Sequence, residues 1–166
     1  MITLRAAEER DLPAILAIHN HAVLHETSIW NDQVVDLAER RSWWQARVAR
    51  GFPLSVADAD GLVAGYGTFG DFRPHQGCRF TVEHSVYVAS DSRRQGIGAA
   101  LLEHLIVEAR RLKMHAMVGG IASDNFASLA LHARFGFVET GRMPQVGFKF
   151  GRWLDLVFMQ KLILTA

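Results

Sequence analysis

The chain has 166 residues, of which 49% are hydrophobic and 21% charged, and these values predict a soluble globular protein with a single domain over residues 1–166. The net charge of +1 predicts no strong attraction to nucleic acid or to a membrane surface, and no apolar run is long enough to cross a bilayer. The single cysteine, Cys78, excludes an internal disulfide, and the amino terminus enters a strand pattern without a leader, so we expect a cytoplasmic protein.

The spacing of apolar residues predicts strands and helices in alternation along the chain. Asp11 is expected to cap the first helix, and Asp60-Gly61 between apolar runs indicates a hairpin. This order predicts an α/β fold (α+β, mixed sheet) with helices on both faces of the sheet. The expected strands cover 2–6, 54–57, 62–69, 81–88, 115–121, a strand starting at 136–138, and 153–164; the expected helices cover 11–23, 36–50, 99–112 and 125–135; a covering loop is expected at 24–33, a turn-rich connection at 70–79, and a loop or short bulged element at 143–152.

The stretch from Thr81 to Leu102 organises the rest of the chain, because a strand there feeds a glycine-containing turn that opens a helix. The first turn of a helix offers unpaired backbone N–H groups and the positive end of the helix dipole. Gly96 and Gly98 leave those groups open, and Arg93 and Arg94 add positive charge. The turn is therefore a candidate binding site for a pyrophosphate.

Two common phosphate-binding motifs do not fit this turn. A P-loop would end in Gly-Lys-Ser/Thr, and a dinucleotide fingerprint would need a third glycine. An Arg-x-x-Gly-x-Gly turn after a long strand instead resembles the acetyl-CoA motif of the Gcn5-related N-acetyltransferase (GNAT) superfamily, whose order of elements the whole chain also resembles. The chain is similar to the phosphinothricin and methionine sulfoximine N-acetyltransferases within that superfamily, in the stretches GDFRP, TVEHSVYV, SLALHARFGF and MPQVGFKFGRWLDLVFMQ.

This resemblance implies transfer of acetyl from acetyl-CoA to the α-amine of a small amino acid such as methionine sulfoximine, methionine sulfone or phosphinothricin, with detoxification as a hypothesis of role. It also implies a homodimer, and a gap between the strands at 81–88 and 115–121 that holds acetyl-CoA. Relatives often carry aromatic residues at the positions of His75 and Cys78, so the pocket here is expected to be more polar. The resemblance implies substrate contacts from Arg73, Pro74, His75 and Glu83, and cofactor contacts from Val86, Tyr87, Val88, Arg93, Arg94, Gln95, Gly96, Ile97, Gly98, Ala99 and Asn125.

Glu83 is the acidic residue that we expect to act in catalysis, since an ammonium substrate must lose a proton before it attacks a thioester. The alternative is that Glu83 is an ordinary strand residue or an ion-pair partner of Arg73 or Arg79. The resemblance places His132 where many relatives have a tyrosine proposed as the acid for the departing thiolate, although His132 could equally be a packed residue. Asn125 could likewise be an ordinary helix cap.

Arg73 is expected to bind a carboxylate, because its planar guanidinium matches one with two hydrogen bonds; the alternative is a solvated loop residue. The eight histidines lack the spacing of a zinc site, and we expect no metal. Two other functions stay open at this point. One is acetylation of a different amine, such as a polyamine, an aminoglycoside or a peptide amino terminus, and the other is a non-catalytic module that binds acetyl-CoA.

Overall fold

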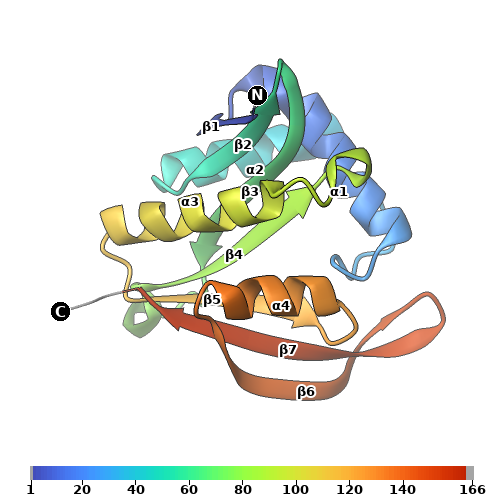
Figure 1. Cartoon of the computed structure of the whole chain (residues 1–166), viewed down its shortest axis with the longest axis vertical. Coiled ribbons are helices and arrows are strands. Elements are labelled where there is room, and N and C mark those ends of the chain that lie inside the picture. The colour runs from blue at the N-terminus through green and yellow to red at the C-terminus, as the bar shows by residue number, and fades with distance from the viewer. Residues whose placement is uncertain (1, 164–166) are drawn as a thin grey trace.

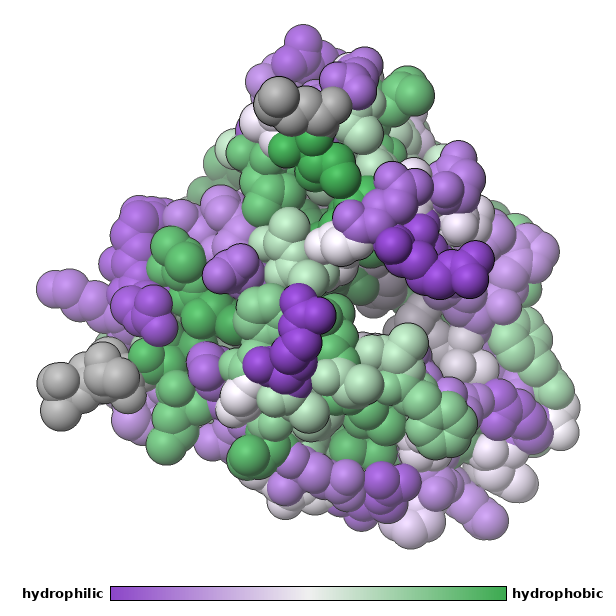
Figure 2. Space-filling model, viewed as in Figure 1, coloured by the Kyte–Doolittle hydropathy of each residue, from purple (hydrophilic) through white to green (hydrophobic). Residues whose placement is uncertain are grey.

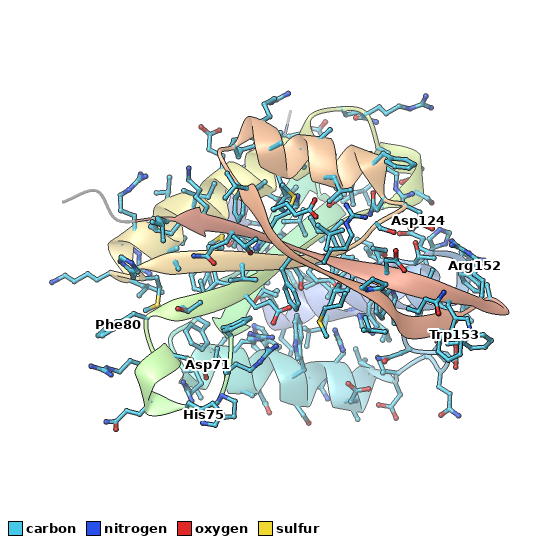
Figure 3. All side chains as sticks on the ribbon, turned by 90° about the horizontal axis from the view of Figure 1, so that it is seen from below. Asp71, His75, Phe80, Asp124, Arg152 and Trp153 are labelled. Atoms are coloured by element: carbon cyan, nitrogen blue, oxygen red, sulfur yellow. The ribbon has the colours of Figure 1, made fainter. Side chains whose placement is uncertain are left out.

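The computed structural model describes residues 2–163, which form one seven-stranded mixed sheet flanked by helices (Figure 1). The strands are β1 (Ile2–Ala6), β2 (Leu54–Ala59), β3 (Leu62–Asp71), β4 (Thr81–Val88), β5 (Ala116–Ala122), β6 (Val138–Lys149) and β7 (Arg152–Leu162); the helices are α1 (Leu12–His25), α2 (Leu37–Ala49), α3 (Ile97–Arg111) and α4 (Phe126–Arg134); short 3-10 turns lie at Glu9–Asp11, Gln76–Cys78 and Ser90–Ser92. The strand order is β1-β2-β3-β4-β5-β7-β6. Helices α3 and α4 cover one face of the sheet and α1 and α2 the other (Figures 1 and 3), which confirms the predicted fold class.

The two strands at the centre of the sheet, β4 and β5, pair with each other over only part of their length. Strands β4 and β5 are parallel, and they pair only from Thr81–Ala116 to Glu83–Val118. Beyond Glu83, β4 continues to Val88 in pairing with β3 alone, whereas β5 continues to Ala122 in pairing with β7. The two strands therefore separate after Glu83, as the family resemblance implies.

Strand β4 separates two hydrophobic cores because its side chains alternate between the faces. Val82 belongs to the core beneath α3 and α4, whereas Tyr87 packs against the core beneath α1 and α2. Helix α3 contributes a continuous buried stripe to the sheet, formed by Ile97, Leu101, Leu102, Leu105, Ile106 and Ala109. None of the described helices combines the length and the apolar character needed to span a membrane.

Helix α3 begins at Ile97, two positions before the predicted start at Ala99. The reason is the backbone of Gly96, which has a φ of +80° and therefore places the left-handed residue immediately before the first helical residue. Ile97 is only 2% exposed, so it anchors the first turn of the helix in the core. The backbone N–H groups of that turn are consequently held in a fixed position at the mouth of the gap between β4 and β5.

The prediction for residues 143–152 was wrong in extent. The segment is mostly strand, because β6 runs continuously from Val138 to Lys149 and turns through Phe150-Gly151 into β7. The expected bulge does occur, since the pairing with β7 shifts between Met143 and Gly147. Pro144 lacks an N–H for the ladder and Gln145 has a φ of +53°, which explains the bulge. The predicted end of the last strand, Leu164, lies outside the described residues.

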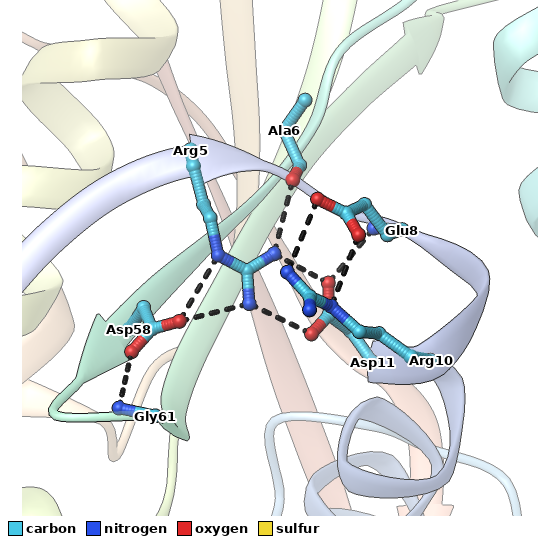
Figure 4. Close-up of polar contacts among 7 residues, drawn as sticks. All are labelled: Arg5, Ala6, Glu8, Arg10, Asp11, Asp58 and Gly61. Atoms are coloured by element: carbon cyan, nitrogen blue, oxygen red, sulfur yellow. Dashed lines mark hydrogen bonds and ion pairs between the residues drawn. The ribbon is translucent and has the colours of Figure 1, made fainter.

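Asp11 lies at the amino-terminal end of α1, but its side chain does not cap that helix as predicted. Its carboxylate instead accepts hydrogen bonds of 2.7 and 2.8 Å from Arg5 and one of 2.8 Å from the backbone N–H of Glu8 (Figure 4). Arg5 also binds Asp58, whose second oxygen accepts from the N–H of Gly61 in the hairpin turn. The cluster ties β1 and α1 to the β2–β3 hairpin.

We expect Asp11→Asn to lower the free energy of unfolding by about 2 kcal/mol, because it removes the charge from buried hydrogen bonds. Arg5 holds the pKa of Asp11 below its ordinary value of 3.8. The stabilisation is therefore present above pH 3.8 and is lost as the pH falls through the lower pKa of the folded protein. Urea denaturation at pH 7 and at pH 3 checks this, since the difference between wild type and Asp11→Asn should shrink at pH 3. An equal difference at both pH values would contradict it.

Candidate active site

The gap between β4 and β5 opens into a cavity of about 520 Å³. Figure 2 shows this face of the molecule hollowed between the region of α3 and that of α4. The structure brings nearly all of the predicted cofactor residues to the cavity wall, whereas Gln95 is exposed and does not line it. The predicted residues that line it are Val86, Tyr87, Val88, Arg93, Arg94, Gly96, Ile97, Gly98, Ala99, Asn125 and His132.

One end of the cavity is formed by the turn between β4 and α3, with its open helix terminus. Arg94 and Gly96 both have positive φ, of 60° and 80°, which curves the backbone before α3. No side chain crowds either glycine of the turn. A Cβ atom on Gly98 would lie 3.6 Å from its nearest neighbour, and a Cβ atom on Gly96 would have no neighbour within 4 Å. Arg93 lines the cavity, but its guanidinium already forms an ion pair with Glu26 and contacts the carbonyl oxygen of Val88, both of which line the cavity as well. The turn has the shape of an anion site.

Asn125 is both a helix cap and a cavity residue. Its side-chain oxygen accepts a 3.1 Å hydrogen bond from the N–H of Ser128, as the structural alternative predicted. This cap leaves the NH₂ group of the Asn125 amide as the donor for a ligand in the cavity.

A second cavity of about 220 Å³ lies on the other side of the gap. It shares Ser28, Gly120 and Ala122 with the larger cavity, so the two spaces adjoin where β4 and β5 separate. Its polar wall is formed by Glu83, Arg73, Thr27 and Ser28, and its apolar wall by Trp30, Leu156 and Phe158. A small molecule with both charged groups and an apolar chain matches this composition.

Glu83 and Arg73 face each other across the second cavity. The closest side-chain atoms, Arg73 Nη1 and Glu83 Oε2, are 3.9 Å apart, and both side chains are partly exposed. Burial raises the pKa of Glu83, and the charge of Arg73 opposes this shift. The guanidinium of Arg73 stacks on the ring of Phe72 and donates a 2.7 Å hydrogen bond to the backbone carbonyl oxygen of Phe72. The pair offers an anion for an ammonium group and a cation for a carboxylate.

Pro74 and His75, the other two predicted substrate residues, are exposed and line neither cavity. His75 lies on the connection between β3 and β4, where its backbone precedes the 3-10 turn at Gln76–Cys78. In Figure 3 it appears near Asp71, at the opposite end of the view from Asp124 and Trp153. Substrate contact by Pro74 and His75 stays a prediction.

The segment between α1 and α2, which the sequence predicted to be a covering loop, lines the second cavity with Thr27, Ser28 and Trp30. Lys149, buried in β6, donates to the carbonyl oxygens of Glu26 at 2.6 Å and of Ile29. Trp30 packs against Gly147 of β6, where a side chain would overlap the indole ring. Thr27 donates to Asp124, which also pairs with Arg152 near the hairpin (Figure 3). These contacts attach the segment to β6 and to Asp124, which precedes α4.

Several residues of the site were not identified from the sequence. Thr27, Ser28, Leu156 and Phe158 approach Glu83 only through tertiary packing, and no local motif marks them. His84 carried a usable signal, because it alternates with Glu83 in β4 and must face the opposite side of the sheet. It is buried against His132, with 2.8 Å between the two Nε2 atoms. Within residues 2–163, no group of three His, Cys, Asp or Glu residues is arranged for a metal ion.

Comparisons with protein families, with curated proteins and with solved structures all find acetyltransferases. The family described as acetyltransferase (GNAT) domain matches residues 4–158. The L-methionine sulfoximine/L-methionine sulfone acetyltransferase of Salmonella typhimurium is 53% identical over 96% of this chain and 93% of that protein. The phosphinothricin N-acetyltransferase of Alcaligenes faecalis is 41% identical over 96% of this chain and 81% of that protein. The structure of the acetyltransferase yncA from Salmonella typhimurium with its cofactor acetyl-CoA has a TM-score of 0.98 and 51% identity, covering 100% of this chain and 96% of that one.

Proposed function

The chain belongs to the GNAT acetyltransferase family and is an acetyl-CoA-dependent acyltransferase, and on this premise we propose that it acetylates the α-amine of a small amino acid or analogue of the methionine sulfoximine, methionine sulfone or phosphinothricin type. The observation that carries the proposal is the second cavity, which places Glu83 and Arg73 beside apolar side chains where the two cavities adjoin. An α-amino acid has an ammonium group, a carboxylate and a side chain that match these three features.

The residues present fit acetyl-CoA in the larger cavity. The amino-terminal turn of α3, from Gly96 to Ala99, would hold the pyrophosphate, and Arg94 would add charge. The free edge of β4 from Val86 to Val88 would receive the pantetheine arm, since its backbone groups have no strand partner in β5. When bound, acetyl-CoA supplies the activated acetyl group as a thioester.

Glu83 acts as the base in this proposal. It accepts a proton from the substrate ammonium group, either directly or through a water molecule, and leaves a neutral amine. The neutral amine would attack the thioester carbonyl carbon. The C–N bond would form, the C–S bond would break with its electron pair on sulfur, and the nitrogen would lose its second proton to solvent. His132, which lines the larger cavity, returns a proton to the sulfur. Arg73 holds the substrate carboxylate, so that the amine points toward the place where the cavities adjoin.

The composition of the second cavity disfavours the other acceptors. A polyamine or an aminoglycoside carries several positive charges, and Arg73 would repel it. A peptide would need an extended groove, whereas this cavity has a volume of only about 220 Å³ and is lined on one side by Trp30. A non-catalytic module that only binds acetyl-CoA would have no need for a partly buried carboxylate next to the thioester site. A cytoplasmic location is part of the proposal, because acetyl-CoA is an intracellular metabolite.

We also propose that the protein is a homodimer. The β6–β7 hairpin lies at an edge of the molecule in Figure 1. It carries a group of large apolar side chains that are 46–60% exposed: Val146, Phe148, Phe150 and Trp153. Such a group on a small protein is typical of a surface that a partner covers. Sedimentation equilibrium distinguishes a dimer from a monomer directly, and a monomer at micromolar concentration would contradict this proposal.

The experiment that tests the proposed function measures release of free thiol from acetyl-CoA with a panel of acceptors. The panel contains methionine sulfoximine, methionine sulfone, phosphinothricin, ordinary amino acids, spermidine and an aminoglycoside. We expect turnover with the small amino acids and analogues and none with spermidine or the aminoglycoside. Turnover only with the polycations would refute the substrate class, and no turnover with any acceptor would favour the binding module.

A further inference from the structure

Two histidine rings meet edge to edge in the wall of the larger cavity. His84 on β4 and His132 on α4 are 6% and 5% exposed, and their Nε2 atoms are 2.8 Å apart. The Nδ1 atom of His84 lies 2.9 Å from the carbonyl oxygen of Val118, and the Nδ1 atom of His132 lies 2.7 Å from that of Ser128. Each ring therefore contacts a carbonyl oxygen at one nitrogen and the other ring at the second nitrogen.

His132 Nδ1 also lies 3.3 Å from the Ser128 hydroxyl, but its contact with the Ser128 carbonyl oxygen is shorter, at 2.7 Å. A carbonyl oxygen only accepts hydrogen bonds, so these short contacts assign a hydrogen to each Nδ1 atom. If both rings were neutral, both Nε2 atoms would then be bare, with two lone pairs opposed at 2.8 Å. A proton between them turns this repulsion into a hydrogen bond. We propose that His84 and His132 share one proton between their Nε2 atoms, so that the pair forms a single cation in the cavity wall.

The surroundings limit the pair to one extra proton. Burial lowers the pKa of both rings, to about 3 for His84, and so opposes any charge on the pair; repulsion between two charged rings would further exclude a second extra proton. The case for the first extra proton rests on the 2.8 Å contact between the two Nε2 atoms. Among the described residues, those in hydrogen-bonding or ring contact with the pair are Val118 of β5, Ser128 of α4 and Phe137, and none of them is charged. The charge is therefore shared by the two rings, and the backbone carbonyl oxygens of Val118 and Ser128 face it at the Nδ1 atoms. No carboxylate among these contacts neutralises it.

Two consecutive glycines of β5, Gly119 and Gly120, leave space on the two opposite faces of the sheet where side chains would otherwise lie. A Cβ atom on Gly119 would lie 3.5 Å from each of the two Nε2 atoms and 2.9 Å from Cε1 of His84. The missing side chain thus leaves both Nε2 atoms access to the cavity that Gly119 lines. A Cβ atom on Gly120 would point the other way, 3.4 Å from Glu83 Oε1. The proton-sharing pair and the carboxylate therefore lie on opposite sides of the same point in the gap.

The role of this cation rests on the proposed function. Its charge stabilises the electron pair that collects on sulfur as the C–S bond breaks. His132 Nε2 then gives the shared proton to sulfur, which leaves two neutral rings, and a proton from solvent restores the pair before the next turnover. Glu83 releases the first proton of the ammonium group to solvent, and the second proton that the nitrogen loses as the amide forms also passes to solvent. Two protons therefore leave and one returns in each cycle, which matches the net release of one proton in the reaction. His84 is a positioning residue, because it holds the proton at His132 Nε2.

The protonation state is tested on the wild type by ¹⁵N NMR of the histidine ring nitrogens, assigned through the contacts of both rings with Phe137. We expect the pair to carry three protons on its four nitrogens at pH 7, with both Nδ1 atoms protonated and the third proton shared between the Nε2 atoms. Two protons in total, in any tautomer, would overturn the proposal. This readout does not depend on turnover, so it separates a failure of this inference from a failure of the proposed function.

The catalytic role is tested with His84→Gln, and with His115→Gln as a control because His115 is an exposed histidine outside the site. We expect His84→Gln to lower kcat by about tenfold to a hundredfold with little change in the KM for acetyl-CoA. Wild-type activity should fall at alkaline pH as the pair loses its shared proton, and this dependence should be absent in His84→Gln. A folded His84→Gln protein with the kcat and pH profile of the wild type would refute the role.

Discussion

Glu83→Gln is expected to lower kcat/KM for the amino acid acceptor by about a thousandfold at pH 7, within the range for the loss of a general base. Glutamine keeps the size of the side chain and its oxygen acceptor, but it cannot take a proton from the ammonium group. The KM for acetyl-CoA should change little, because Glu83 lines the second cavity and not the larger one. Initial rates with both substrates varied in turn separate these effects.

The control is Glu103→Gln, which makes the same change on the exposed face of α3 and should leave both parameters at the wild-type level. The pH profile gives a second check. Glu83 works as a base only when ionised, and burial raises its pKa above the ordinary 4.5, so wild-type activity should fall on acidification at a higher pH than for an exposed glutamate. If Glu83→Gln retained most of the activity, a water molecule or another group would be the base.

The fold was predictable from the sequence because its signals are local. The alternation in Thr81–Val88 and the helical period after Gly96 fixed the two elements on which the site is built. The extent of β6 was not predictable, since Pro144 and two glycines are typical of loops and only pairing with β7 holds the segment as a strand. The Phe150-Gly151 turn likewise lacks the asparagine or aspartate that usually marks a hairpin of this kind.

The candidate site was predictable on the side of acetyl-CoA and only partly on the side of the acceptor. The proposed phosphate site consists of consecutive residues at a helix terminus, which leave a motif in the sequence, and all of the predicted cofactor residues except Gln95 line the larger cavity. The second cavity, which we propose binds the acceptor, is assembled from distant segments: Trp30 packs at Gly147 and its segment is held by the buried Lys149, so that Trp30 and Glu83 line the same cavity. No pattern in the sequence records such contacts.

Arg73→Ala is expected to raise the KM for the amino acid acceptor by about a hundredfold, because it removes a charged hydrogen-bonding partner of the substrate carboxylate. The loss should be much smaller for the carboxamide of the same acceptor, which has no negative charge to bind. Arg73→Lys should recover part of the affinity, since it restores the charge without the planar fork. Arg79→Ala is the matched control, because Arg79 lies on the same connection but stacks on Phe80 and lines neither cavity.

The same substitution changes the electrostatics of the base. The charge of Arg73 opposes the rise in the pKa of Glu83 that burial causes. Without that charge the pKa of Glu83 should rise further, and the acidic limb of the activity profile should move to higher pH. A pH series of kcat for Arg73→Ala at saturating acceptor measures this shift apart from binding. If the acidic limb stayed in place and the acid and the carboxamide lost affinity equally, Arg73 would neither bind the carboxylate nor act on Glu83.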